Sequence, residues 1–255
     1  MHGVGGEDDV DELFEQWRSL RERHGDAVDL HDLYDLVAGA RGIVPDDLAL
    51  EERQALAARA LKVIWPGFEQ VAAVRAGGRI EVVPYDERWP QQFAELRDRL
   101  VDSLGATAQR IDHIGSTSVP GLDAKPIIDV QISVADVADE GSYVAGCVAP
   151  GFELYSRDDV HRFFAVPAPR PRDAQLHVCE GGGAFERDHL VFRDYLRTHD
   201  EERDAYAAMK RDAAQRWADD RLGYTYAKSE LILELLASAV TWSQQTGWTV
   251  EAASS

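Results

Sequence analysis

Apolar residues recur every three or four positions through the first part of the chain. Leu13, Trp17 and Leu20 show this spacing, and two further apolar runs repeat it before residue 65. Spacing of this kind places apolar side chains on one face of a helix, so it predicts amphipathic helices. We therefore expect residues 1–78 to form a helical extension, with a linker near Gly77.

The pattern changes after residue 78, where short β-branched runs begin to alternate with longer helical ones. Strands are predicted at 80–85, 108–116, 125–134, 152–156, 162–167 and 174–179. Helices are predicted at 87–105, 136–147, 185–199, 200–220 and 225–243. Elements in this order predict an α+β fold, a mixed sheet flanked by helices, for a domain at 79–245. Residues 246–255 are expected to form a flexible tail.

Composition and charge limit the classes of protein to which this chain can belong. Hydrophobic residues make up 45% of the 255 residues, enough to bury a substantial core. A net charge of -19 repels the phosphates of nucleic acids, so it argues against a nucleic-acid partner. Two cysteines are too few for a disulfide framework. The acidic N-terminus and the lack of a long apolar run predict a cytoplasmic protein without signal peptide or membrane contact.

A dense motif, HIGSTSVPGLDAKPIID, occupies residues 113–129 at the junction of two predicted strands. A strand that ends in Gly-Ser presents backbone N–H groups and a hydroxyl, which suit phosphate oxygens. Asp129 stands in an otherwise apolar strand, where a carboxylate is costly to bury unless a metal ion or another partner balances it. The residues expected to bind phosphate at this bend are Gly115, Ser116, Thr117, Ser118 and Lys125.

This motif, with HLVFRDYLRTH at 189–199 and YTYAKSELI at 224–232, resembles the GrpB family over about residues 80–240. The resemblance implies a nucleotidyltransferase-like fold, in which a Gly-Ser turn follows one strand and a pair of acids stands on the next. It also implies a Mg²⁺ ion that positions a nucleoside triphosphate for transfer to a small-molecule acceptor. Residues 1–78 lie outside the resemblance.

The resemblance gives Asp129 and Ser116 the catalytic positions, but the metal set is incomplete. Gln131 replaces the second acid of the pair, and His177 stands on the strand expected to supply a third. The expected metal ligands are therefore Asp129, Gln131 and His177. On an alternating strand His113 shares the face of Gly115, so it is expected either to join the catalytic residues or to be a hydrogen-bonded structural residue.

Further nucleotide contacts are expected from cationic and imidazole side chains elsewhere in the domain. An arginine near a phosphate site can clamp a triphosphate through two parallel hydrogen bonds. A lysine at the start of a helix is slightly disfavoured by the helix dipole, which favours a binding role for Lys228. Each of these residues also fits a purely structural role. They are Arg162, His189, Arg193 and Lys228.

The incomplete acid set leaves three hypotheses open. The first is a Mg²⁺-dependent nucleotidyltransferase that uses a nucleoside triphosphate and a small-molecule acceptor. The second is a module that binds a nucleotide or another phosphate ligand without transfer, with the N-terminal helices available to dock a partner. The third is a hydrolase that holds a transition metal through Asp129, His177 and Cys179, since the last two share one strand face.

Overall fold

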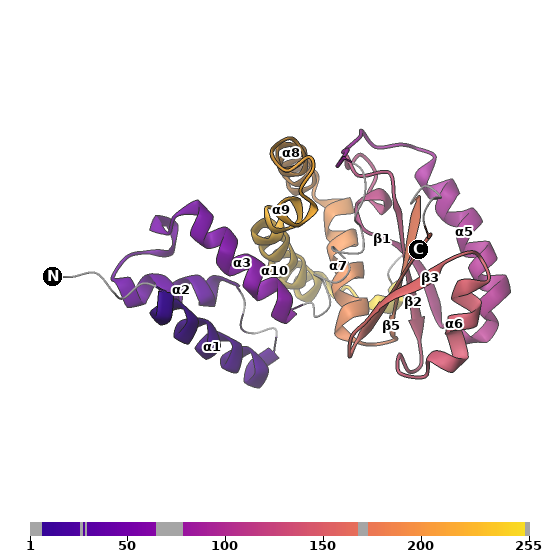
Figure 1. Ribbon diagram of the computed structural model, residues 1–255, viewed down its shortest axis with the longest axis horizontal. Helices are drawn as coiled ribbons and strands as arrows, with labels where there is room; N and C mark the ends of the chain where they lie inside the picture. The colour runs from indigo at the N-terminus through magenta and orange to yellow at the C-terminus, as the bar shows by residue number, and fades with distance from the viewer. Residues whose placement is uncertain (1–6, 26–27, 29, 65–78, 168–172, 253–255) are drawn as a thin grey trace.

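A five-stranded mixed sheet forms the centre of the larger part of the chain (Figure 1). The computed structural model describes residues 7–25, 28, 30–64, 79–167 and 173–252. The strand order is β1-β2-β5-β4-β3, and every neighbouring pair is antiparallel except β2 and β5. The strands are β1 (Arg110–Ile114), β2 (Ile128–Val134), β3 (Glu153–Arg157), β4 (His161–Ala165) and β5 (Ala174–Glu180).

Helices cover both faces of this sheet, which confirms the predicted α+β fold. Helices α5 (Trp89–Leu104) and α6 (Glu140–Val148) lie on one face, and α7 (Ala184–Thr198) lies on the other (Figure 1). We call these the α5 face and the α7 face. Because successive residues of a strand point to opposite sides, each strand contributes alternate residues to the two faces.

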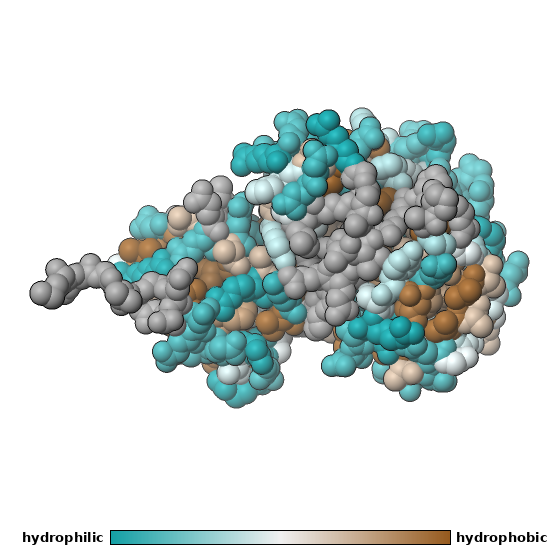
Figure 2. Space-filling view, viewed as in Figure 1, coloured by the Kyte–Doolittle hydropathy of each residue, from teal (hydrophilic) through white to brown (hydrophobic). Residues whose placement is uncertain are grey.

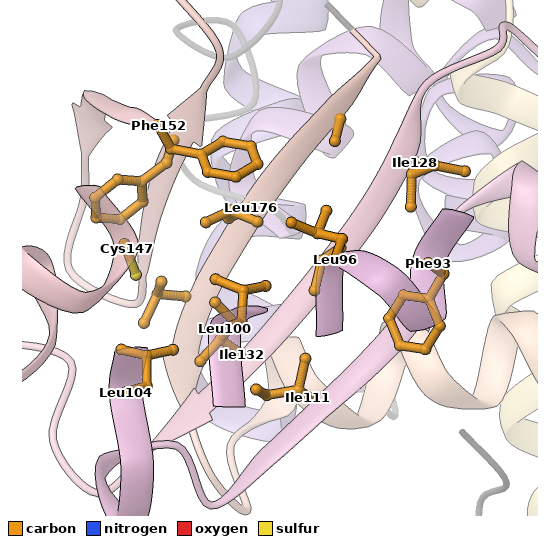
Figure 3. Close-up of a cluster of buried hydrophobic side chains, with 14 of the residues drawn as sticks. Phe93, Leu96, Leu100, Leu104, Ile111, Ile128, Ile132, Cys147, Phe152 and Leu176 are labelled. Carbon is orange, nitrogen blue, oxygen red and sulfur yellow. The ribbon is translucent and has the colours of Figure 1, made fainter. Parts of the chain in front are cut away.

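The α5 face holds the main hydrophobic core (Figure 3). Helix α5 buries five apolar residues spaced three or four apart, and they pack against alternate residues of β2 and β5. Gly105 ends the helix with a positive φ of 55°, a conformation that costs glycine little. The helical residues that face the sheet are Trp89, Phe93, Leu96, Leu100 and Leu104.

Three further helices follow α7 and connect it to the N-terminal extension. They are α8 (Asp200–Arg216), α9 (Arg221–Tyr226) and α10 (Ser229–Thr246). The extension consists of α1 (Glu7–His24), α2 (Leu30–Arg41) and α3 (Leu50–Ile64), as the apolar spacing predicted. It has a hydrophobic core of its own, which Leu233 of α10 completes, and it lies on the side of α10 away from the sheet (Figure 1). The expected domain boundary near residue 78 lies outside the described residues.

Two predicted elements differ from the structure. Residues 80–85 were expected to form a strand, but within them only Val83 pairs, through an isolated bridge to Ala124. Pro84 has no N–H to extend that pairing. The helix predicted at 225–243 is divided, because α9 ends at Tyr226 and α10 begins at Ser229.

The described part of the C-terminal segment makes hydrogen bonds to the domain. The indole Nε1 of Trp248 donates a hydrogen bond to Asp194 Oδ2 at 3.0 Å. The carbonyl of Val250 accepts one from Arg110 at 2.7 Å. These contacts fix the described part of the tail, which reaches residue 252.

Among the residues coloured by hydropathy in Figure 2, many on this face are hydrophilic, and hydrophobic residues form patches between them. This surface agrees with the strongly acidic composition. Within the described ranges, none of the helices combines the length and the apolar character needed to cross a lipid bilayer.

Candidate functional site

The polar residues of the central strands meet on the α7 face. Asp129 of β2 lies opposite Gln175 of β5, and Gln131 lies opposite His177. Their neighbours Ile128, Val130 and Ile132 belong to the core on the α5 face. The alternation of apolar and polar residues along β2 and β5 therefore brings carboxylate, amide and imidazole groups together beneath α7.

Asp129 is the accessible carboxylate of this group, with 22% of its side chain exposed. Its Oδ1 accepts a hydrogen bond from Gln175 Nε2 and lies 3.4 Å from His177 Nε2. Gly115 packs directly against it, because a Cβ on Gly115 would overlap the Asp129 carboxylate. Gly115 also has a φ of +68°, so both its conformation and its contact require glycine. The bend and the carboxylate predicted from the motif are thus adjacent.

Ser116 follows this glycine and meets a lysine that the sequence analysis did not assign to the site. Its Oγ accepts a hydrogen bond from Lys210 Nζ of α8 at 2.9 Å and also bonds to the Tyr206 side chain. The Lys210 ammonium lies 4.5 Å from the centre of the Tyr206 ring, and the residue is only 2% exposed. Burial raises the pKa of the Tyr206 hydroxyl to about 12, so that hydroxyl stays protonated and can donate.

Lys210 is a buried cation without a carboxylate partner in the described part of the chain. Burial lowers its pKa well below the ordinary value, and the charges of Lys228 and Arg211 lower it further. The negative charge of Asp123 opposes this lowering of the Lys210 pKa, but the Asp123 carboxylate is itself paired with Arg211. Among the described residues, no carboxylate pairs directly with the Lys210 ammonium, so the cost of burying it is only partly offset.

Two more lysines stand beside it. Lys125 Nζ lies 4.9 Å from the centre of the Tyr224 ring, and Lys228 Nζ lies 4.4 Å from the same ring. We call Lys125, Lys210 and Lys228 the lysine cluster. The chain has four lysines among 27 basic residues, so three of its four lysines gather at this one place.

A chain of imidazoles extends from Asp129 of β2 across β5 to β4, on the same face of the sheet. His177 Nδ1 lies 3.1 Å from His161 Nε2, and His161 Nδ1 lies 3.6 Å from Asp158. Three links thus join the Asp129 carboxylate to that of Asp158 through two imidazoles. If both imidazoles are neutral they carry two N–H protons in these links, so only two of the three can be hydrogen bonds at one time. Burial lowers the pKa of His161 to about 4, although the hydrogen bond to Asp158 opposes the shift.

His189 lies at the edge of this imidazole group. Its ring stacks on Phe185 at 4.2 Å and lies 6.3 Å from the ring of His177. Burial lowers the pKa of His189 to about 3, and the neighbouring His177 adds to the effect. The structure thus places His189 beside the site as expected, but as a neutral aromatic neighbour of His177.

His113 and Arg162 lie on the face of the sheet opposite to Asp129, where both make contacts that fit the structural roles left open for them. His113 pairs with Val130 in register, stacks on Phe93 of α5 and lies 3.0 Å from Thr117 Oγ1. Arg162 binds Glu140 of α6 at 2.6 Å. Alternation along a strand fixes which residues share a face, but it does not tell which face also holds Asp129.

Three other expected ligand contacts are occupied within the protein. Arg193 is 1% exposed and fastens α7 to β1 through the His113 carbonyl at 3.0 Å. The Thr117 hydroxyl donates to the Ile127 carbonyl, and Ser118 Oγ donates to the Gly115 carbonyl at 2.6 Å. Among the hydroxyls of the motif, Ser116 is therefore the one directed at the lysine cluster.

The residues expected to bind a metal ion do not form a complete set of ligands around one position. No group of three or more His, Cys, Asp or Glu side chains is placed to hold a metal ion within the described ranges. Gln131 is fully buried, and neither its amide oxygen nor its amide nitrogen has a hydrogen-bond partner there. Cys179 pairs with Ser133, four residues along β2 from Asp129, a separation of about 13 Å. The set Asp129, His177 and Cys179 is therefore not assembled.

The residues that sequence reasoning missed are Lys210, Tyr206, Tyr224 and Gln175. Lys210 and Tyr206 are one helical turn apart in α8, and Ser116 lies 94 residues before Lys210. The scarcity of lysine was the available signal. Where arginine is the common cation, a retained lysine marks a place that suits a compact ammonium group.

Comparison with known proteins agrees with the geometry of the fold. A family model described as GrpB protein matches residues 79–238. A UPF0157 protein of Streptomyces coelicolor is 41% identical over 155 residues, covering 61% of this chain and 81% of that protein. The crystal structure of GrpB from Enterococcus faecalis has a TM-score of 0.58 and 28% identity, covering 64% of this chain and 99% of that one.

One relative has a more specific name. A dephospho-CoA kinase of Mycolicibacterium paratuberculosis is 29% identical over 195 residues, which cover 66% of this chain and 48% of the kinase. The match therefore spans about half of that protein. Because the family model matches well over half of its length, this chain belongs to the GrpB family.

Proposed function

We propose that this chain binds a small phosphate-bearing ligand of the nucleotide class at the Ser116 bend. The observation that carries the proposal is the buried Lys210 ammonium, which donates to Ser116 Oγ and has no carboxylate partner among the described residues. An isolated buried charge is costly, and a bound anion removes that cost. A phosphate group beside Ser116 would accept from Lys210 and supply the missing charge.

The charges around the bend favour a ligand with more than one negative charge. The lysine cluster contributes three cationic side chains, and Lys125 and Lys228 both lie over Tyr224. Asp129 stands at the edge of this group and would repel an anion placed directly against it. A di- or triphosphate fits better than a single monoanion, because its charges can be shared among the lysines.

Nucleotidyl transfer to a small-molecule acceptor is the second candidate. It is favoured by the contact between Asp129 and Gly115, which places a partly exposed carboxylate beside the phosphate-binding bend. The residues present do not fit a two-metal carboxylate site, because Gln131 is a buried amide and Glu180 of β5 lies opposite Val134, five residues along β2 from Asp129. Asp129 would be the residue that holds a single Mg²⁺ ion, which would neutralise phosphate charge at the bend.

Kinase activity is not proposed for this chain. The relative named dephospho-CoA kinase is matched over only 48% of its length. The chain also contains no Gly-x4-Gly-Lys-Ser/Thr sequence, the phosphate-binding loop of one large class of nucleotide-using enzymes.

A thermal-shift series tests the binding proposal. The full chain is heated with inorganic pyrophosphate, AMP, ADP or each nucleoside triphosphate, with and without MgCl2. A ligand that binds the folded state raises the unfolding temperature by mass action, so we expect larger shifts for di- and triphosphates than for AMP. The absence of a shift with every ligand contradicts the proposal.

Transfer is tested separately with the ligand that gives the largest shift. The Asp129→Asn variant and the natural chain are incubated with that triphosphate, Mg²⁺ and a mixture of small acceptors, and pyrophosphate release is measured. Release by the natural chain that is lost in Asp129→Asn supports transfer. Binding without release leaves a binding module.

A further inference from the structure

We propose that the N-terminal helices position the segment that carries Tyr224 and Lys228, and so act as part of the lysine cluster's support. This role rests on the proposed function only for its effect on ligand binding. The extension lies outside the family match, which begins at residue 79. The contacts that carry the inference all fall between the extension and residues 226–233.

The first contact is a polar one between three residues. Arg53 Nε of α3 lies 3.2 Å from Glu230 Oε1 of α10, and the two side chains are 29% and 14% exposed. Tyr34 of α2 hydrogen-bonds to the same glutamate, and its hydroxyl lies 3.2 Å from the Arg53 carbonyl. The Arg53 Nε has no hydrogen-bond partner among the residues that the structure describes, so the arginine acts as a charge close to Glu230. Glu230 follows Lys228 by two residues.

The second contact lies on the other side of Lys228. Lys62 Nζ of α3 lies 5.7 Å from the centre of the Tyr226 ring, the last residue of α9. Leu233, one turn into α10, belongs to the hydrophobic core of the extension. The extension therefore holds the chain before and after Lys228, at Tyr226, Glu230 and Leu233.

The backbone around Lys228 makes the position of that residue depend on these contacts. Ala227 and Lys228 join α9 to α10 and belong to neither helix. Lys228 is the N-cap residue of α10, and its side chain makes no capping hydrogen bond to the described start of that helix. A joint between two helices allows one to turn relative to the other, so the position of Lys228 over Tyr224 depends on what holds both sides. The extension is placed to do this through two polar contacts and one apolar one.

Lysine-selective ¹³C labelling gives a direct test, since four lysines yield four sets of Cε–Hε signals in NMR spectra of the full chain. Each set is assigned by replacing one lysine with arginine. The test variants are Arg53→Ala and Glu230→Gln, which remove the charge contact from either side. The matched control is Arg59→Ala, which breaks an ion pair of the same helix with Asp11 of α1 at 2.8 Å.

We expect the Lys228 signals, which feel the ring of Tyr224, to move in both test variants and to stay in place in Arg59→Ala. The affinity for inorganic pyrophosphate should fall by about 2- to 30-fold in the test variants alone. Unchanged Lys228 signals in two folded test variants overturn the inference. If the signals move but the natural chain binds no pyrophosphate, the positioning stands and the proposed function fails.

Discussion

The two faces of the β-sheet are built from alternate residues of the same strands, yet they differ in kind. On the α5 face, Val130 and Ile132 pack in a dry apolar core. On the α7 face, Asp129, Gln131 and Ser133 of the same strand meet imidazoles, amides and a buried glutamate. A shift of one residue along β2 therefore changes the surroundings from hydrocarbon to hydrogen-bonding groups.

The difference teaches how stability and chemistry are divided in this fold. The α5 face contributes stability by removing apolar surface from water. The α7 side contains groups that oppose stability, such as the buried Gln131 amide, which has no hydrogen-bond partner among the described residues, and the buried Lys210 ammonium. Residues that break the local rules of folding in this way are expected at functional sites.

The largest effect should come from truncating the apolar face. Ile132 is fully buried in the core under α5 (Figure 3), so Ile132→Ala leaves a cavity and removes packing contacts. We expect a loss of about 2 to 5 kcal/mol in the free energy of unfolding, measured by urea titration. A loss below about 1 kcal/mol would show that the two faces do not differ as described.

A smaller effect concerns the one imidazole that the apolar face contains. Burial lowers the pKa of His113 to about 4, with a minor opposing effect of Asp129, against an ordinary value of 6.5. The unfolded chain binds more protons between these values, so stability is lost as the pH falls from about 6.5 toward 4. We expect His113 to contribute about 1 to 2 kcal/mol of the loss between pH 7 and pH 5.

His113→Gln measures this contribution, because glutamine does not titrate. Urea unfolding of the variant at pH 7 and pH 5 should show a weaker dependence on pH than the natural chain shows. An identical dependence in both proteins would mean that the His113 imidazole is not held neutral by its contacts with Phe93 and Thr117.

The smallest effect should have the opposite sign and should come from the polar face. Gln131 is buried next to Ile132, but both of its amide atoms lack partners among the described residues. Gln131→Leu removes an unsatisfied polar group at similar volume, so we expect the free energy of unfolding to rise by about 1 kcal/mol. A clear destabilisation would instead reveal partners for the amide.

Much of the fold could be predicted from the sequence, because the periodicities are local. The five sheet strands, the helices α5, α7, α8 and α10 and the helical extension all coincide with predicted segments. The exception at 80–85 has strand-like composition, but its neighbour in space is the single residue Ala124. Composition reports what a segment favours and not whether an unpaired strand edge is available beside it.

The candidate site could be predicted only in part. Some of its residues are far apart in the sequence, and the sequence does not show which face of the sheet a strand residue lies on. The motif itself joined Gly115, Ser116 and Asp129, since one strand and one bend connect them. Lys210 comes from a helix 94 residues away from Ser116, so no local pattern links the two. The face on which Arg162 lies could not be predicted, because it is set by the register of β4 with β5.

The buried Lys210 tests the central claim most directly. Isothermal titration of inorganic pyrophosphate into Lys210→Met is compared with the natural chain and with Arg59→Met, which removes a cation of α3 that pairs with Asp11 outside the cluster. We predict that Lys210→Met loses about 10- to 100-fold in affinity, while Arg59→Met retains the natural value. Pyrophosphate binding of equal affinity in all three folded proteins would contradict the account, because the buried ammonium would then serve no anion.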